Sequence, residues 1–491
     1  LLDEHLLNQK YTQIEELVSN HDLITQLEDN LKIIDLERIY RRFNIGKLNP
    51  YELPRIEHSN FKIRNLLEIV SKQKKLKTVR TLLPNKSVLI QFSEYMKELD
   101  AMFDYSKCQK TNLTDINLNF FKTGYHRQLD SLDQQLEEQF QMLEHLASWL
   151  GKFVDVGDTK KKTAKSVSPE NYVSVKFNDK DGHWLDISTV RGKKLKMNLD
   201  SQKYPKETIG DLVFETKALE YNHQNKSNIK INSHQIKKIS RTYLGIKDKL
   251  LSLVRKIYLE SIQYLFNKYY FGCIEDINQF ITHLDVVKSN AKCAYLYKYT
   301  RPVIKKQSGY SEIKVSQVRH PIIERILADS GRKYVPNDLY LGPQESNLVY
   351  GVNSVGKSSL LKSIAVCIIM AQSGMYVAAS ECQLSLYQKV FTRMGNDDNL
   401  YSNHSSFVKE MTESREIIQK CDSHSLVIAD ELCASTETES ALKIVCSIIK
   451  ILSEKQSSFL FATHLFKITE CPLVQQISSV KYKHLKVDFH E

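Results

Sequence analysis

Residues 351–358 have the spacing of a phosphate-binding loop: two glycines enclose four residues, and a lysine and a serine follow. An apolar strand is predicted just before this run, and a helix is predicted over 359–370. Backbone N–H groups and a helix N-terminus in that context bind phosphate groups. The run therefore predicts a nucleoside triphosphate site, in which Lys357 reaches the β- and γ-phosphates and Ser358 binds Mg²⁺.

A second group of polar residues ends another apolar strand. Asp430 and Glu431 directly follow the run Leu-Val-Ile-Ala at 426–429. In phosphate-loop proteins, the first carboxylate at this place supports Mg²⁺. The second carboxylate is placed to orient or deprotonate an attacking water. The alternative is a strand followed by an ordinary acidic turn, and the phosphate loop that precedes it in the chain argues against that alternative.

A third apolar run, 459–462, ends in Thr463 and His464. A histidine there could sense the γ-phosphate, although a histidine after a strand is more often a surface or hydrogen-bonded residue. Together with 348–350 and 426–429, this run predicts the buried strands of a parallel α/β sheet that begins near residue 313.

Apolar residues at intervals of three and four predict one helix over 23–43. The same intervals predict two long helices further along the chain, one over 125–150 and one over 236–257. Burial in one globular bundle explains these stripes as well as a coiled-coil-like pair does. Between them, alternating runs at 172–177 and 184–188 flank a turn, which predicts a β-hairpin. If the helices are antiparallel, this β-rich insert lies at their far tip.

Positive charge gathers in the same insert. The chain has a net charge of +11, residues 331–491 are nearly neutral, and residues 160–206 hold 12 basic and 5 acidic side chains. Such an excess favours a polyanionic partner, although a solvated lysine-rich surface is the plain alternative. The predicted DNA-contacting lysines, suited to phosphate rather than to base reading, are Lys160, Lys161, Lys162, Lys176, Lys193, Lys194 and Lys196.

Length and composition limit the class of protein. A chain of 491 residues with 42% hydrophobic residues is long enough for several domains. No apolar stretch is long enough to span a bilayer, so no membrane partner is expected. Nine scattered cysteines without a C-x-x-C pair argue against a disulfide scaffold and for a reducing, intracellular compartment. The compartment could be a nucleus, cytoplasm, viral factory or mitochondrion. Because the chain opens at Leu1, a trimmed fragment is expected.

The phosphate loop, the acidic pair and the Thr-His pair, in this order along the chain, resemble the motifs of the MutS family of DNA-repair ATPases. The likeness extends upstream to 35–50, which is similar to the family's lever region. The segments that carry it near the nucleotide site are 319–324, 334–338, the asparagine-containing loop 351–359, 370–379, 391–411, 430–432 and 461–464.

The resemblance implies a multidomain α and α/β protein. A helical lever and core with long helical arms would carry a small β-rich clamp, followed by a P-loop ABC-type α/β ATPase domain. The expected boundaries are 1–124 for the helical core, 125–154 for the first lever helix, 155–233 for the basic clamp, 234–304 for the second lever helix and return to the core, and 305–491 for the ATPase domain.

The resemblance also implies an activity, a DNA-dependent ATPase that hydrolyses ATP to ADP and phosphate. ATP and Mg²⁺ would be its cofactors, and double-stranded DNA and a homodimeric or related MutS-like subunit its partners. The nucleotide would control a DNA clamp used in mismatch repair or recombination-linked repair. Glu431, His464 and Lys357 would be catalytic, and Ser358 and Asp430 would hold the metal. The nucleotide would contact Gly351, Asn353, Ser354, Gly356, Lys357, Ser358, Ser359, Tyr334 and Ser405.

Two of these assignments need comment: that of Ser405 depends on a second subunit, and that of Tyr334 has an alternative. Ser405 belongs to a loop that, in the family's dimers, reaches the other subunit's nucleotide. Asn403 replaces the glycine expected before that loop, so the chain departs from the family pattern at the trans contact. Tyr334 could stack on adenine, or it could equally be a packed core tyrosine.

The sequence departs from the common family pattern at several points. After Asp-Glu-Leu, the family usually has Gly-Arg-Gly-Thr-Ser, whereas this chain has Cys-Ala-Ser-Thr-Glu at 433–437. That variant is more similar to the MutS branch of giant viruses and octocoral mitochondria. The family's N-terminal mismatch-reading domain, with its Phe-x-Glu wedge, has no counterpart in this chain. A further carboxy-terminal tail of strand and dimerising helices would be expected after Glu491.

Two other classes of function compete with this interpretation. SMC-type and transporter-type or other ABC-type ATPases also combine phosphate loops with helical arms, but they carry a Leu-Ser-Gly-Gly loop, which this sequence lacks. A structural DNA-binding protein with a weak, degraded ATPase is the other alternative. The intact Lys357, Ser358, Asp430, Glu431 and His464 argue against it.

Overall fold

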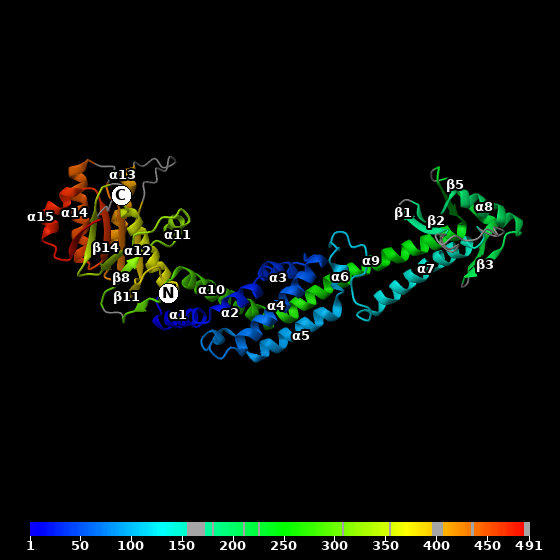
Figure 1. Cartoon of the computed structure of the whole chain (residues 1–491), viewed down its shortest axis with the longest axis horizontal. Coiled ribbons are helices and arrows are strands. Elements are labelled where there is room, and N and C mark those ends of the chain that lie inside the picture. The colour runs from blue at the N-terminus through cyan, green and yellow to red at the C-terminus, as the bar shows by residue number, and fades with distance from the viewer. Residues whose placement is uncertain are drawn as a thin grey trace. The chain divides into compact units, whose positions relative to one another are not determined.

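The computed structural model describes nine stretches of the chain, which form two compact units. The first unit combines residues 1–32, 63–83 and 279–491, and the second combines 33–62 and 84–278 (Figure 1). No helix in these stretches is long and apolar enough to cross a membrane. The described residues are 1–154, 172–178, 181–209, 212–223, 226–306, 309–352, 355–394, 406–433 and 437–485.

A five-stranded parallel sheet forms the centre of the first unit. All four pairs of neighbouring strands run in the same direction. The three apolar runs predicted as buried strands are three of its members, so the expectation of an α/β unit with a parallel sheet is confirmed. In spatial order the strands are β12 (Lys389–Arg393), β13 (Ser425–Asp430), β14 (Ser458–Thr463), β10 (Ser346–Tyr350) and β15 (Val480–His484).

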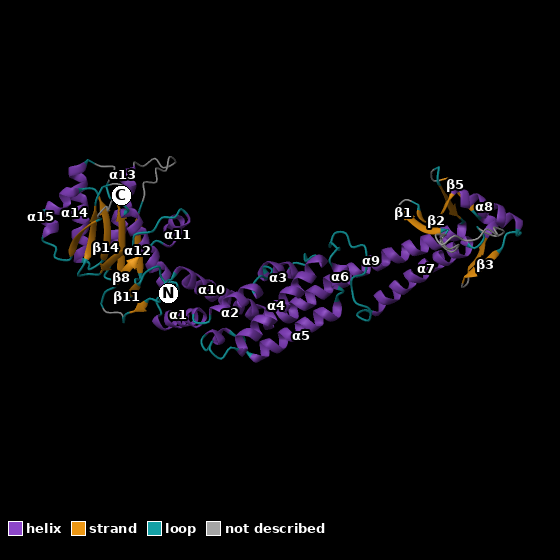
Figure 2. Ribbon diagram, in the orientation of Figure 1, coloured by secondary structure: helices purple, strands orange, loops and turns teal. Residues whose placement is uncertain are grey.

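Helices cover both faces of this sheet (Figure 2). Val427 and Phe461 pack against helix α14 (Thr438–Glu454) in one buried apolar cluster. Because side chains alternate along a strand, Ile428 points to the opposite face. Helix α12 (Lys357–Gln372) contacts β13 and β14 there. Strands buried on both faces explain why the sequence shows continuous apolar runs instead of alternation.

A second, mixed sheet and several helices complete the first unit. The order of this sheet is β7 (Val303–Ile304), β11 (Glu381–Leu384), β8 (Ile313–Val318) and β9 (Asn337–Leu341). The Tyr11 hydroxyl donates a hydrogen bond to the Ala371 carbonyl at 2.6 Å, which ties α1 to the end of α12. The other elements are α1 (Glu4–Val18), α2 (His21–Asn30), η2 (Val79–Leu82), α11 (Pro321–Asp329), α13 (Ser406–Lys420), η6 (Phe466–Glu470) and α15 (Pro472–Gln475).

The continuous helix expected over 23–43 is wrong. Helix α2 ends at Asn30, and α3 (Leu36–Asn44) begins after a break. The Asp35 carboxylate accepts a hydrogen bond from the Arg38 backbone N–H at 3.0 Å, so it starts a new helix. The apolar spacing continued across the break because both helices bury apolar residues. Helix α4 (Leu53–Lys72) and helix α10 (Glu275–Tyr297) each contain a boundary between the two units.

The second unit contains the two predicted long helices, α7 (Arg127–Gly151) and α9 (His234–Tyr269), packed along each other (Figure 1). The pair is antiparallel. Tyr125, just before α7, has its hydroxyl 3.0 Å from the Ser261 Oγ late in α9, whereas Leu146 lies in one apolar cluster with Ile236 early in α9. The unit also contains η1 (Pro50–Glu52), α5 (Lys86–Met102), α6 (Tyr105–Cys108) and the π-helix η5 (Tyr270–Ile274).

The predicted hairpin between these helices is present. Strands β1 (Ser174–Asn178) and β2 (Gly182–Ser188) pair antiparallel, with Asn178 opposite Gly182. Leu185 and Phe214 of the insert share an apolar cluster with residues of α7 and α9, so the insert packs on the helix ends. Its further elements are α8 (Thr189–Ser201), β3 (Lys206–Ile209), β4 (Leu212–Glu215), η4 (Thr216–Ala218), β5 (Glu220–His223) and β6 (Asn228–Asn232).

Candidate nucleotide site

The carboxyl ends of three neighbouring strands bring the predicted polar residues to one edge of the parallel sheet. In the register, Tyr350 at the end of β10 lies opposite Thr463 at the end of β14. Asp430 at the end of β13 lies opposite Ala462 of β14. The phosphate loop, the acidic pair and His464 therefore follow adjacent strand ends. Ligands of open α/β sheets bind at this edge.

The phosphate loop leads directly from β10 into α12. Gly356 precedes the helix with a φ of +97°, a backbone conformation that favours glycine. The Lys357 side chain is buried at 5% exposure. Its Nζ donates hydrogen bonds to the carbonyls of Gly351 at 2.7 Å and Val352 at 3.0 Å. The ammonium thus lies inside the curve of the loop, at the positive N-terminal end of α12, where an anion would bind.

The hydroxyls that follow the lysine are less buried. Ser358, in the first turn of α12, is exposed, and Ser359 is half-buried. An exposed hydroxyl beside a phosphate loop is available to a ligand or a metal ion, as the sequence predicted for Ser358.

The acidic pair combines one buried carboxylate oxygen, on Asp430, with a half-exposed glutamate, Glu431. The Asp430 Oδ1 atom is buried and accepts no hydrogen bond within the part of the chain that the structure describes. A buried carboxylate oxygen without a donor is costly, and a metal ion would remove that cost. Glu431 has a φ of +56°, and its backbone N–H donates to the Ala462 carbonyl at 2.9 Å. Its carboxylate is therefore directed by a turn that is bonded to the neighbouring strand.

His464 lies beside Glu431. Its Nδ1 is 3.6 Å from the Glu431 Oε1, and both side chains are about half exposed, at 46% and 40%. The preceding Thr463 is buried, and its Oγ1 accepts the Leu465 backbone N–H at 3.0 Å. That bond shapes the turn after β14. The histidine and the glutamate thus face one solvent-accessible space at the sheet edge.

Tyr334 lies against α12. It is half-buried in the segment before β9, and its hydroxyl is 3.0 Å from the Ser363 Oγ. Ser363 in turn donates to the Ser359 carbonyl at 2.7 Å, one turn beyond the phosphate loop. This contact places Tyr334 near the loop, and it is compatible with either interpretation of that tyrosine.

Comparison with known proteins shows what this chain is similar to. Residues 347–491 match the sequence model of MutS domain V. A mutS homologue of Acanthamoeba polyphaga mimivirus is 26% identical over 98% of this chain and 46% of the relative. DNA mismatch repair protein MutS of Alkaliphilus metalliredigens is 26% identical over 99% of this chain. DNA mismatch repair protein MutS of Lactococcus lactis subsp. cremoris is 28% identical over 94% of this chain. Each alignment covers 50% of the relative. The chain is similar to members of the MutS family over nearly its whole length, and the family model of domain V matches its last third. It spans about half the length of these curated relatives.

Several residues predicted from the resemblance to MutS lie outside the described residues. These are Asn353 and Ser354 of the phosphate loop, Ser405 of the serine-containing loop, and Lys160, Lys161 and Lys162 of the insert. The other predicted DNA-contacting lysines are described and exposed: Lys176 on β1, and Lys193, Lys194 and Lys196 on α8. They belong to the second compact unit, whereas the nucleotide site belongs to the first.

Glu410 lies in the segment 391–411 that resembles MutS, but sequence reasoning assigned no role to it. It lies on α13, is only 4% exposed, and accepts the Cys433 backbone N–H at 2.7 Å. Cys433 is two residues after Glu431, so this carboxylate is bonded to the turn of the acidic pair. The signal in the sequence was a glutamate on the apolar face of α13, three residues after Phe407 and seven before Ile417. A buried acid on such a face needs a donor.

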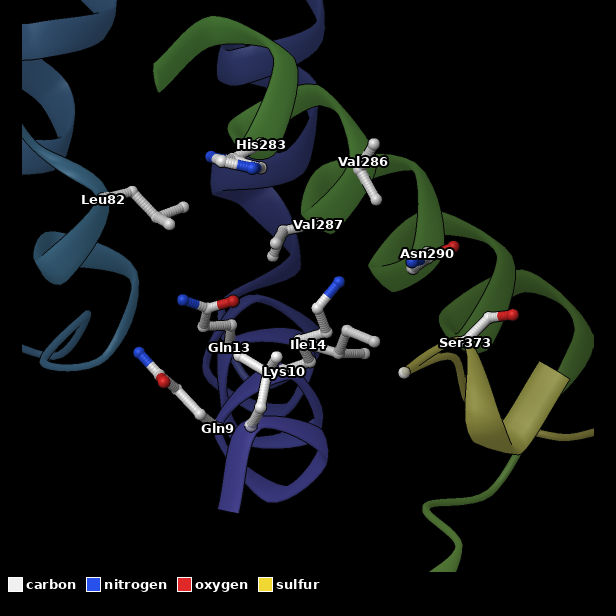
Figure 3. Close-up of a pocket in the computed structure, with 12 residues that line it drawn as sticks. Gln9, Lys10, Gln13, Ile14, Leu82, His283, Val286, Val287, Asn290 and Ser373 are labelled. Atoms are coloured by element: carbon white, nitrogen blue, oxygen red, sulfur yellow. The ribbon is translucent and has the colours of Figure 1, made fainter. Parts of the chain in front are cut away.

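A cavity elsewhere in the same unit is not part of this site. It has a volume of about 160 Å³ and lies among α1, α10 and the turn after α12 (Figure 3). Its wall includes Ile14, Leu82 and Val287, and none of the predicted nucleotide residues lines it. Ligand pockets usually hold about 300–1,000 Å³. This cavity is therefore smaller than a typical ligand pocket.

Proposed function

We propose that this chain is the nucleotide-hydrolysing and DNA-clamping part of a MutS-type DNA-repair protein. One observation carries the proposal: the phosphate loop, Asp430–Glu431 and His464 follow adjacent strand ends at one edge of a parallel sheet. ATP would bind there with its phosphates over the N-terminus of α12. Its hydrolysis to ADP and phosphate would control the clamp during mismatch repair or recombination-linked repair.

The phosphate-binding role falls to the loop. Lys357 supplies the positive charge, and its two carbonyl partners, Gly351 and Val352, keep the ammonium oriented. Mg²⁺, when bound, neutralises charge on the phosphate oxygens. Ser358 and Asp430 would hold it, and the unpartnered Oδ1 of Asp430 fits that role.

The hydrolytic role falls to the pair at the solvent-accessible edge. Glu431 would orient and deprotonate the water that attacks the γ-phosphate. His464, 3.6 Å from it, would contact the γ-phosphate and keep the glutamate in place. Tyr334 would stack on adenine from its place against α12.

The clamp role rests on the second unit. A basic insert packed on the ends of two antiparallel helices is the arrangement expected of a lever and clamp. Its exposed lysines, among them Lys176 and Lys193, are suited to the phosphate backbone of double-stranded DNA. The names of the relatives as DNA mismatch repair proteins support the same function.

The alternatives remain an SMC-type or other ABC-type DNA-associated ATPase, and a structural DNA-binding protein with a weak ATPase. Release of radiolabelled phosphate from ATP, measured with and without duplex DNA, tests all three. We expect magnesium-dependent turnover that changes when DNA is added. Turnover indifferent to DNA would favour another ABC-type ATPase, and DNA binding without turnover would favour the structural protein. Loss of the signal in Lys357→Ala rules out a contaminating ATPase.

A further inference from the structure

The turn that carries Glu431 has an unfavourable backbone conformation. Glu431 and Cys433 have φ values of +56° and +62°, in the left-handed region that residues with a side chain rarely adopt. Such a turn persists only where surrounding contacts hold it. At its first residue, the hydrogen bond from the Glu431 N–H to the Ala462 carbonyl provides one such contact.

Glu410 provides the contact at the other end. Its carboxylate accepts the Cys433 backbone N–H at 2.7 Å, and both residues are buried, with exposures of 4% and 1%. A hydrogen bond from a backbone N–H to a carboxylate is stronger than one between neutral groups, and burial strengthens it further. Between the two anchors, Leu432 packs into the apolar cluster under the sheet.

The Cys433 thiol does not contribute a charge to this arrangement. Burial, together with the charge of Glu410, raises the pKa of that thiol to about 11. The thiol therefore stays neutral at physiological pH. The interaction that matters is between the Glu410 carboxylate and the Cys433 backbone.

Glu410 also links this turn to another element. It lies one turn into α13, which begins at Ser406, next in sequence to the serine-containing loop. A displacement at the start of α13 therefore moves the acceptor of the Cys433 N–H. The turn would then lose its hydrogen bond to Glu410, and the Glu431 carboxylate would no longer be held in one orientation.

We propose that Glu410 is a positioning residue, which holds Glu431 in its hydrolytic orientation and couples the start of α13 to that orientation. This inference rests on the proposed function, because it concerns the rate at which bound ATP is hydrolysed. Glu410 acts through the Cys433 N–H and contacts neither nucleotide nor water.

The test compares the turnover number at saturating ATP with the affinity for nucleotide. We expect Glu410→Ala to lower the turnover number by about 10- to 100-fold, because a small displacement of a reacting group has effects of that size. The dissociation constant for ATP should change less than about threefold. Glu410→Gln keeps a carbonyl oxygen at the same place and should recover most of the rate. Glu416→Ala is the matched control, because Glu416 is exposed on the same helix and pairs only with Lys420 among the contacts described.

Amide hydrogen exchange of the peptide that contains Cys433 gives a readout that does not require hydrolysis. Exchange should be slow in the parent, Glu410→Gln and Glu416→Ala, and faster in Glu410→Ala. Parental turnover or unchanged exchange in Glu410→Ala, or a glutamine variant as slow as the alanine variant, would overturn the inference. A parent that binds no nucleotide and has no turnover would instead overturn the proposed function, and the catalytic coupling with it.

Discussion

At the scale of single residues, Lys357 is the first test of the phosphate loop. Its ammonium is buried and bonded to two loop carbonyls, so it serves the loop rather than the apolar core. Lys357→Ala should lower ATP hydrolysis by at least ~100-fold, because it removes a preorganised charge from the transferring phosphoryl group. The melting temperature should stay close to that of the parent. Steady-state turnover and thermal unfolding measure both, and hydrolysis at the parental rate would remove the phosphate-loop assignment.

Glu431 offers a sharper test, because its change to glutamine keeps the shape of the side chain. Glu431→Gln should still bind ATP but hydrolyse it about 10²–10⁴ times more slowly, the usual effect of losing a general base. The turn itself should persist, since its anchors are backbone groups and Glu410. Filter binding and single-turnover hydrolysis separate the two effects. If ATP binding were lost while turnover per bound ATP stayed constant, Glu431 would be structural.

Much of the candidate nucleotide site could be predicted from the sequence because its signals are local. The spacing of Gly351, Gly356 and Lys357 fixes a strand, a loop and a helix that are consecutive in the chain. The role of Glu410 could not be predicted in this way. Its hydrogen bond to Cys433 joins residues 23 positions apart, and only the tertiary fold brings α13 next to the turn that follows β13.

At the scale of elements, the same contrast holds. The strands β10, β13 and β14 were predicted because burial on both faces leaves an apolar run in the sequence. Their spatial order could not be predicted, because β14 lies between β13 and β10 although it follows both in the chain. The false continuous helix over 23–43 shows the limit of apolar spacing, which reports burial but not the break before Asp35.

The insert provides a prediction about pH at this scale. His183 on β2 is buried beside Phe140, Phe177 and Tyr243. Burial, and secondly the charge of Lys247, lowers the pKa of this histidine below its usual 6.5. Below pH 6.5 the unfolded chain takes up a proton that the folded insert resists, so stability falls as the pH decreases and is constant above that range.

His183→Phe should remove this dependence, because phenylalanine fills the aromatic site and does not titrate. We expect the melting temperature of the variant, relative to the parent, to rise as the pH falls from 7.5 to 5.5. The other histidines are present in both proteins, so their contributions cancel in the difference. A difference that is independent of pH would show that His183 keeps an ordinary pKa in the folded insert.

At the scale of the whole molecule, the first prediction concerns assembly. Ser405 lies outside the described residues, and its proposed role is to complete the nucleotide site of a second subunit. ATP hydrolysis should then require a homodimer or a related MutS-like partner, and specific activity should rise with protein concentration. Sedimentation velocity and turnover, measured over the same concentrations, provide the test. Constant specific activity in a sample shown to be monomeric would count against the trans contact.

The last prediction concerns DNA, and the sequence offers a matched control for it. The four residues Lys-Lys-Leu-Lys occur twice, at 193–196 on α8 of the insert and at 74–77 in the first unit. In both copies the leucine is buried and the lysines are exposed. Replacing the three lysines by alanine therefore removes the same charge from two surfaces that have similar local packing.

If the insert is the clamp, the two triple variants should differ in the salt dependence of DNA affinity. Each lysine that neutralises a phosphate contributes a slope of about −0.9 in log affinity against log salt concentration. The variant at Lys193, Lys194 and Lys196 should weaken binding to matched and mismatched duplexes alike and flatten the slope by up to ~3 units. The variant at 74–77 should keep the parental slope. Equal slopes in parent and insert variant would mean that these lysines are only a solvated surface, and the clamp role of the insert would have to be abandoned.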